Sequence, residues 1–334
     1  MRFLRVSAHD IAAAYNQNMS RVLAWFRSGR GLARYAAVVL GFMVLVILWG
    51  AVVRATGSGA GCGNHWPLCN GDFFPHHPRL ATVIEFTHRS MSGVCTTLVA
   101  VLVAWTFVVR PRGDRARRAV VWSGVLLLTE ALLGAVLVKG GYVEQNASNM
   151  RVLVQCVHFT NTMLLMAALT LTWWWLAERE ATLQTGVTAR GIAWTALAAT
   201  VVVGATGSVA ALADTLFPSP SLSAGLAQDF AAGAPLLVRM RWLHPAAALV
   251  GLACAIWLSM ALRSRPARWL LALIAAQFVL GAADVLLLAP VWMQVLHLLG
   301  ADLYWIALVA VCAGVFSEIT VARSPFTPTE KLSA

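Results

Sequence analysis

The sequence predicts an all-α polytopic membrane protein with eight transmembrane helices, arranged as two tandem, pseudo-symmetric four-helix bundles. Of its 334 residues, 59% are hydrophobic and only 12% are charged, which is about half the charged fraction of a soluble domain. Several apolar runs also reach the ~20 residues that cross a bilayer as a helix. A third observation, an internal repeat, predicts the division into two bundles.

The helices follow from apolar runs separated by polar or charged segments. The predicted spans are 34–54, 82–109, 117–139, 151–177, 190–212, 237–262, 267–288 and 291–317. They imply a cytoplasmic segment 1–33, an N-terminal bundle 34–178, a C-terminal bundle 179–318 and a cytoplasmic tail 319–334. Within the first segment, residues 10–29 are compatible with an amphipathic surface helix or with a frayed terminus.

Lysine and arginine are distributed unevenly between the two sides of these spans. The side that holds both chain ends carries 18 of the 25, and the other side carries 7. Both termini are therefore predicted to be cytoplasmic, in the cell (plasma) membrane. The net charge of +11 arises mostly from short Arg clusters such as 110–118 and 263–268. Such clusters orient helices and contact the lipid bilayer, and no nucleic-acid motif accompanies them.

Four short sequences recur in the same order in the two halves, each in an equivalent predicted helix or at its end. The pairs are ATGS (55–58 and 205–208), FTHRSMSGV with WLHPAAALV (86–94 and 242–250), LLGAVLV with VLGAADV (132–138 and 279–285), and QCVHF with QVLHL (155–159 and 294–298). Four matches in one order predict a repeat of two four-helix units. An even number of helices per unit makes the two units parallel in the membrane.

Four histidines lie near the outer starts of the even-numbered helices: His88, His158, His244 and His297. Imidazoles from two helices of one bundle are a common means of holding a heme iron from both faces. The repeat therefore predicts two heme sites, one formed by His88 and His158 and the other by His244 and His297. The alternatives are polar side chains that bond across helices, or zinc, for which no helix carries a complete ligand set.

The two halves differ beside their first histidine. Glu85 lies one helical turn before His88, and the matching position before His244 is Arg241. A carboxylate near iron can accept a proton or order water, which makes Glu85 the candidate catalytic group. Its alternative role is an ion pair with Arg89 or Arg151. Arg241 is a candidate contact for a heme propionate.

The first outer loop, about residues 55–81, contains Cys62 and Cys69. Because this loop faces an oxidising compartment, a disulfide is favoured over a partial zinc site that would include His65. An exposed bond in so small a ring is labile, so it could be redox-active or only a structural clip.

The stretch RATGSGAGCGNHWPLCNG (54–71), followed by EFTHRSMSG (85–93), resembles heme A synthase. In that family a Gly-Ser-Gly-x-Gly-Cys…Trp-Pro-Leu-Cys-x-Gly loop precedes a helix start of Glu-x-x-His-Arg, and the similarity extends over nearly the whole chain. Some members carry a second Cys pair in the third outer loop. The corresponding segment 213–240 has none here, which puts in doubt any mechanism that needs both pairs.

The resemblance implies oxidation of the C8 methyl of heme O to the formyl group of heme A, for cytochrome oxidase assembly. It implies substrate heme O at His88 and His158, cofactor heme b at His244 and His297, and functional roles for Glu85 and the Cys62–Cys69 pair. Arg89 joins Arg241 as a candidate propionate contact.

Heme O synthase and an unidentified electron donor are the expected partners, and assembly into a homo-oligomer is left open. The competing functions are a diheme cytochrome b-like electron carrier, such as a quinol oxidoreductase subunit, and a heme transporter or chaperone.

Overall fold

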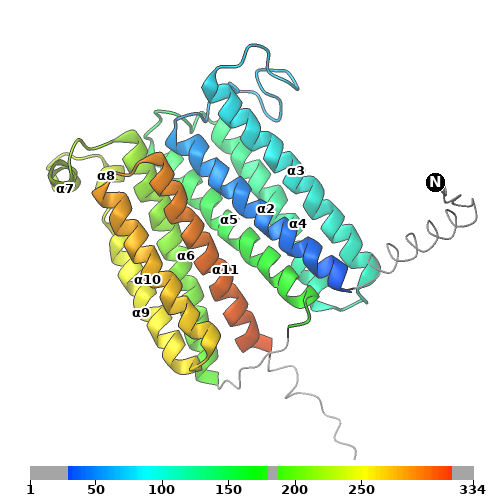
Figure 1. Ribbon diagram of the computed structural model, residues 1–334. Helices are drawn as coiled ribbons and strands as arrows, with labels where there is room; N and C mark the ends of the chain where they lie inside the picture. Colours follow the sequence, from blue (N-terminus) through cyan, green and yellow to red (C-terminus); the bar gives the residue numbers. More distant parts are fainter. Residues whose placement is uncertain (1–28, 180–186, 318–334) are drawn as a thin grey trace, which may run out of the picture.

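A computed structural model describes residues 29–179 and 187–317, and these residues are folded as α-helices joined by short connections (Figure 1). The helices are α2 (Gly29–Ala55), α3 (Leu80–Val109), α4 (Arg115–Lys139), α5 (Asn149–Leu176), α6 (Val187–Leu216), α7 (Leu222–Phe230), α8 (Leu236–Arg239), α9 (Leu243–Leu262), α10 (Arg265–Leu286) and α11 (Val291–Ser317). Within the described residues, eight helical segments are long and apolar enough to cross a membrane, with α8 and α9 forming one of them. The predicted all-α, eight-span fold class is confirmed.

The span boundaries agree closely with the prediction, with two differences. Helix α2 is already formed at Gly29, the first described residue, and so extends before the predicted start at residue 34; Arg30 and Arg34 can extend their charged ends toward water while the backbone stays helical. The predicted surface helix at 10–29 lies almost wholly outside the described residues.

The third outer connection, expected as a loop, holds the short helices α7 and α8, and α6 continues to Leu216. The hydroxyl of Ser221 caps α7 by accepting a hydrogen bond from the Ala224 amide. A search for membrane-length apolar runs cannot detect helices this short.

Helices α2, α3, α4 and α5 pack in a ring, and helices α6, α9, α10 and α11 pack in a second ring; we call these the N-terminal and C-terminal helix groups. The groups meet where α2 and α5 contact α6 and α11 (Figure 1). The start of α2 and the end of α11 lie at the same end of the molecule, as alternating spans require (Figure 1). The proposed domain division at residues 178 and 179 coincides with the connection between the two groups and stays a prediction.

Among the described residues, Arg54 and Trp305 donate hydrogen bonds from one helix group to the other. The Arg54 guanidinium, at the end of α2, donates hydrogen bonds to the Ala211 carbonyl at 2.6 Å, the Thr215 hydroxyl at 2.6 Å and the Gln294 side-chain oxygen at 2.7 Å. The Trp305 indole N–H donates to the Met163 carbonyl at 2.8 Å. Because these donors are satisfied across the contact, the position of one group relative to the other is fixed at the end that carries the histidines and near mid-span.

Candidate functional site

The four predicted histidines lie near the same ends of four different helices, α3, α5, α9 and α11. We call His88 and His158 the first pair and His244 and His297 the second pair. The first pair belongs to the N-terminal helix group and the second to the C-terminal group, as the repeat predicts. Each helix group therefore contains the two imidazoles that the sequence assigned to one site, and the rings of the second pair are in contact.

The imidazole rings of the second pair lie close together. The ring centres of His244 and His297 are 6.2 Å apart and the ring planes are 77° from parallel. Metal–imidazole bonds are about 2 Å long and a ring nitrogen lies roughly 1 Å from its ring centre, so one metal ion between two rings needs about 6 Å. The Nδ1 atom of His244 lies 3.2 Å from the Val203 carbonyl. Donation to this carbonyl leaves Nε2 as the free acceptor.

Three of the four imidazoles pack on a glycine of a neighbouring helix. A Cβ added at Gly207 would lie 2.9 Å from Cε1 of His244, and one added at Gly281 would lie 3.2 Å from the same atom of His297. Gly50 holds a similar position, 3.0 Å from the ring of His88. A larger residue would have to displace each ring, so these glycines set where the imidazoles lie.

Glu85 holds the first outer loop against the start of α3. This side chain is only 3% exposed. Its Oε2 accepts a hydrogen bond from the Cys62 amide at 2.7 Å, and its Oε1 accepts from Arg89 at 2.5 Å. Arg89 in turn donates to the carbonyls of His65 and Leu68, both at 2.6 Å. The ion-pair alternative for Glu85 is thus realised, with Arg89 as the partner, while its position one turn before His88 is kept.

The predicted disulfide is present between Cys62 and Cys69. The loop packs so closely on α3 that a Cβ at Gly61 would lie 2.4 Å from the carbonyl of Ala81, and the Thr82 hydroxyl donates to the Gly61 carbonyl at 2.7 Å. Because both thiols are bonded to each other, they are not available for the alternative zinc site. In the described residues, no three His, Cys, Asp or Glu side chains gather as metal ligands.

The two predicted propionate contacts have protein partners in this structure. Arg89 binds Glu85 and the loop carbonyls. Arg241 lies 3.1 Å from the Asp214 carboxylate and 3.4 Å from that of Asp229. Their role at a heme stays a prediction. The competing partner of Glu85, Arg151, instead donates to the carbonyls of Glu144 and Asn146.

Sequence reasoning missed Glu130 of α4. Its Oε1 lies 3.4 Å from Nδ1 of His158, and its carboxylate accepts hydrogen bonds from Asn161, at 2.6 Å, and from Thr162. The signal was available: extending the LLGAVLV–VLGAADV match by two residues toward the N-terminus aligns Glu130 with Gln277. At this repeat position, as at that of Glu85, the carboxylate is present in the N-terminal half and absent from the matching residue of the C-terminal half.

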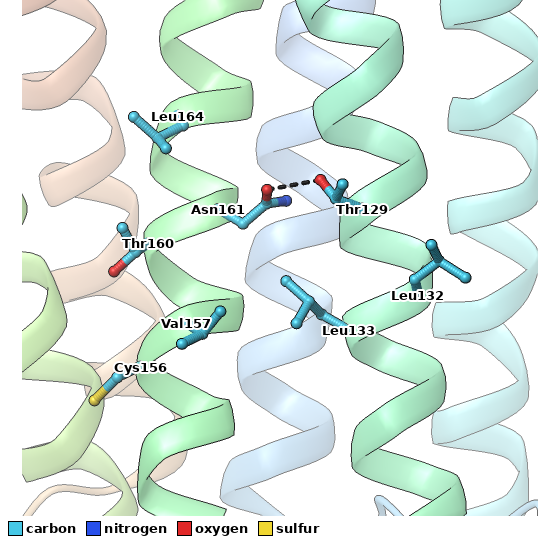
Figure 2. Close-up of a pocket in the computed structure, with 8 residues that line it drawn as sticks. All are labelled: Thr129, Leu132, Leu133, Cys156, Val157, Thr160, Asn161 and Leu164. Carbon is cyan, nitrogen blue, oxygen red and sulfur yellow. Dashed lines mark hydrogen bonds between the residues drawn. The ribbon is translucent and has the colours of Figure 1, made fainter.

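An apolar groove of about 570 Å³ lies between α4 and α5, beside this cluster (Figure 2). Leu132, Leu133, Val157 and Leu164 line it, together with Asn161 and Thr129, whose hydrogen bond links α5 to α4 (Figure 2). Leu132 is 60% exposed, which on a helix that crosses a membrane means contact with lipid. The groove is therefore open to the bilayer on one side and borders the carboxamide that binds Glu130 on the other.

These features define a class: a polytopic membrane protein that carries two imidazole pairs, one in each of two four-helix groups, with a disulfide-closed loop over the first pair. The chain belongs to the COX15-CtaA family of cytochrome oxidase assembly proteins, whose model matches residues 33–309. This places it in the family of heme A synthase, as the loop and the Glu-x-x-His-Arg motif predicted.

The curated relatives carry two different names. The chain is 44% identical over 295 residues to a protein of Thermus thermophilus named protoheme IX farnesyltransferase, and the match covers 86% of this chain and 48% of the relative. It is 34% identical over 153 residues to the heme A synthase of Geobacillus kaustophilus, covering 46% of this chain and 43% of the relative. The heme A synthase of Bacillus pumilus is 39% identical over 142 residues, or 41% and 43% of the two chains. The chain spans about half the length of the curated relatives it matches.

Proposed function

We propose that this protein oxidises the C8 methyl group of heme O to the formyl group of heme A, in support of cytochrome oxidase assembly. One observation carries the proposal: the two imidazole pairs have different surroundings. Beside the first pair, Glu85 lies one turn before His88 and Glu130 lies 3.4 Å from His158, whereas the matching positions beside the second pair are Arg241 and Gln277. One site is thus suited to holding a redox cofactor and the other to chemistry that moves protons.

Heme b is the cofactor that we assign to the second pair. The separation of the two rings, 6.2 Å, fits one iron ion between them. The hydrogen bond from His244 to Val203 leaves Nε2 free as a ligand, and His297 keeps a buried Nδ1 without a hydrogen-bond partner among the described residues. Heme b supplies one-electron redox chemistry when it is bound. The protein would contribute the two imidazoles, their orientation and the apolar surroundings.

Substrate heme O is assigned to the first pair. Nδ1 of His88 is buried without a hydrogen-bond partner among the described residues, so this ring has ligand capacity that the protein leaves unused. The groove between α4 and α5 supports entry from the bilayer, because its apolar walls match the farnesyl tail that heme O carries. The disulfide loop, bound to Glu85, covers the outer end of the same site and would limit access of bulk water.

Two successive hydroxylations of the C8 methyl carbon, each inserting one oxygen atom of O2 and reducing the other to water with two electrons from an external donor and two protons, give a geminal diol, which loses water to form the aldehyde. Glu85 is the group that we assign to proton transfer, since it lies one helical turn from His88 on the same face. In this resting arrangement its two oxygens bind Cys62 and Arg89, so it would act after a change in one of these bonds. An electron donor must complete the reaction.

The Thermus relatives support the place of the reaction in heme O metabolism. They are about twice as long as the matched segment and are named protoheme IX farnesyltransferase, the activity that makes heme O. Heme O synthase is accordingly our proposed partner. The excess of Lys and Arg on one side supports a plasma-membrane protein with cytoplasmic termini and the Cys62–Cys69 loop outside.

The test is to express the full chain in cells that make heme O but no heme A, and to identify the extracted hemes by mass spectrometry. We expect heme A with the wild type, and heme O or a hydroxylated intermediate with Glu85→Gln, a variant that keeps the shape of the side chain. Wild-type yields of heme A from Glu85→Gln would remove Glu85 from the chemistry. A wild-type chain that produces no heme A and binds two hemes b would favour the diheme electron carrier.

A further inference from the structure

Glu130 is an acidic side chain inside a membrane-spanning helix, and the proposed reaction does not yet use it. It is the sixteenth residue of the 25-residue helix α4, about 13 Å from the outer end at 1.5 Å per residue. Ionisable groups at such depth are costly and pair with one another or serve a function. In the described part of the chain, His158 is the basic side chain at ion-pair distance from Glu130, with 3.4 Å between Nδ1 and Oε1.

Two neighbours on α5 hold the Glu130 carboxylate in place. The Asn161 amide donates to Oε2 at 2.6 Å, and the Thr162 hydroxyl donates to Oε1. Asn161 is itself fixed, because its amide also donates to the Leu126 carbonyl and its oxygen accepts from Thr129. The carboxylate therefore faces His158 in one orientation, and a small rotation of the imidazole completes an Nδ1–H···Oε1 hydrogen bond.

The C-terminal half has the same pair of positions filled without charge. Gln277 of α10 replaces Glu130, and Gly300 of α11 replaces Asn161. The two positions touch in both halves: a Cβ at Gly300 would lie 1.9 Å from the Gln277 amide nitrogen. The helix packing is thus shared, and what differs between the halves is the negative charge beside the second imidazole of the pair.

We propose that Glu130 is a positioning residue for His158: its carboxylate accepts the Nδ1 proton of the imidazole and directs Nε2 to the iron of the heme held by the first pair. A carboxylate in this place fixes the tautomer and the ring orientation and makes the imidazole a stronger electron donor. Stronger donation stabilises ferric iron and lowers the reduction potential of that heme relative to one with neutral neighbours. The inference rests on the proposed assignment of His158 to a heme.

The experiment uses the full-length protein with His244→Ala and His297→Ala, so that added iron protoporphyrin IX reports on the first pair alone. Glu130→Gln keeps the shape of the side chain and removes its charge. We expect heme affinity to fall roughly 10- to 100-fold, the midpoint potential to rise, and Glu130→Asp to lie between Gln and wild type. Gln277→Leu is the matched control at the equivalent position and should change neither quantity.

If the protein with His244→Ala and His297→Ala does not fold, heme affinity and midpoint potential at the first pair are measured in the wild type, from the part of the titration signal that His158→Ala removes. Wild-type affinity and potential in Glu130→Gln, with heme lost in His158→Ala, would show that Glu130 only ties α4 to α5, and would overturn the inference while leaving the heme assignment intact. An unchanged heme spectrum in His158→Ala would instead refute the assignment of His158, and with it both proposals.

Discussion

Gly207→Ala isolates the contribution of imidazole position in the second pair. The new Cβ would lie 2.9 Å from Cε1 and 3.1 Å from Nδ1 of His244. Ordinary carbon contacts are about 3.5–4.0 Å, so the ring must retreat from α6 by roughly 0.6 Å. Nδ1 already lies 3.2 Å from the Val203 carbonyl of the same helix. That retreat takes it beyond the ~3.2 Å upper end of normal hydrogen bonds.

Two opposing effects follow from this substitution. Losing the hydrogen bond costs about 1 kcal/mol, and loss of such an outer contact typically weakens metal binding about 10- to 100-fold. Alanine, however, is about 1 kcal/mol better than glycine inside a helix. We therefore expect a protein that folds about as well as the wild type and binds heme b weakly at the second pair.

The assay is titration of heme-free protein with iron protoporphyrin IX, followed by the visible absorption bands of six-coordinate heme. Gly191→Ala is the control on the same helix, because nothing lies within 4 Å of its added Cβ. This substitution changes only the helix propensity of the residue and displaces no imidazole. Equal heme affinity in Gly207→Ala and Gly191→Ala would refute the reasoning.

Three further predictions concern the surroundings of the sites. Arg54→Met removes three hydrogen bonds between the helix groups. Since hydrogen bonds to charged groups are worth about 1.5–3 kcal/mol each, Tm in detergent should fall by several degrees. An unchanged Tm would mean that apolar packing alone holds the two groups together. Glu85→Ala removes the carboxylate partner of the half-buried Arg89 and the acceptor of the Cys62 amide, so it should lower Tm more than Glu85→Gln. The reverse order would contradict the loop-holding role. Burial raises the pKa of the Asp229 carboxyl, with the Arg241 guanidinium opposing the rise; the folded protein therefore keeps this proton to higher pH than the unfolded chain. The stability that this retained proton contributes is complete below about pH 4 and is lost as the pH rises through the folded-state pKa. Between pH 4 and pH 7, Tm should therefore fall less in Asp229→Asn than in the wild type. An identical slope of Tm against pH in the two proteins would show that Asp229 is not the group responsible.

Much of the fold could be predicted because a membrane-spanning helix can be recognised from its amino-acid composition alone. The spans beginning near residues 82, 117, 151 and 291 were placed within two residues of the helices observed. Periodic apolar runs of this length leave few alternatives in a bilayer. Helices α7 and α8 could not be found in the same way, since they are short and lie in a connection whose shape depends on contacts with Arg241 and Ser219.

The part of the candidate site that could be predicted is the set of four histidines, because they lie in the recurring segments of the sequence. His88, His158, His244 and His297 each lie in a sequence segment that recurs in the other half, and each is found near the outer end of its helix. The partners of Glu85 were not predictable, because the Cys62 amide reaches it from a loop whose path the sequence does not specify. Glu130 was overlooked because it lies within an apolar run and the repeat was read only over its most similar residues.

The heme content of the purified full-length protein tests the central claim most directly. Extraction and chromatography should yield heme b together with heme O or heme A from one chain, with His244→Ala removing heme b and His158→Ala removing the other. Two equivalents of heme b per chain, with no heme O or heme A, would contradict the account.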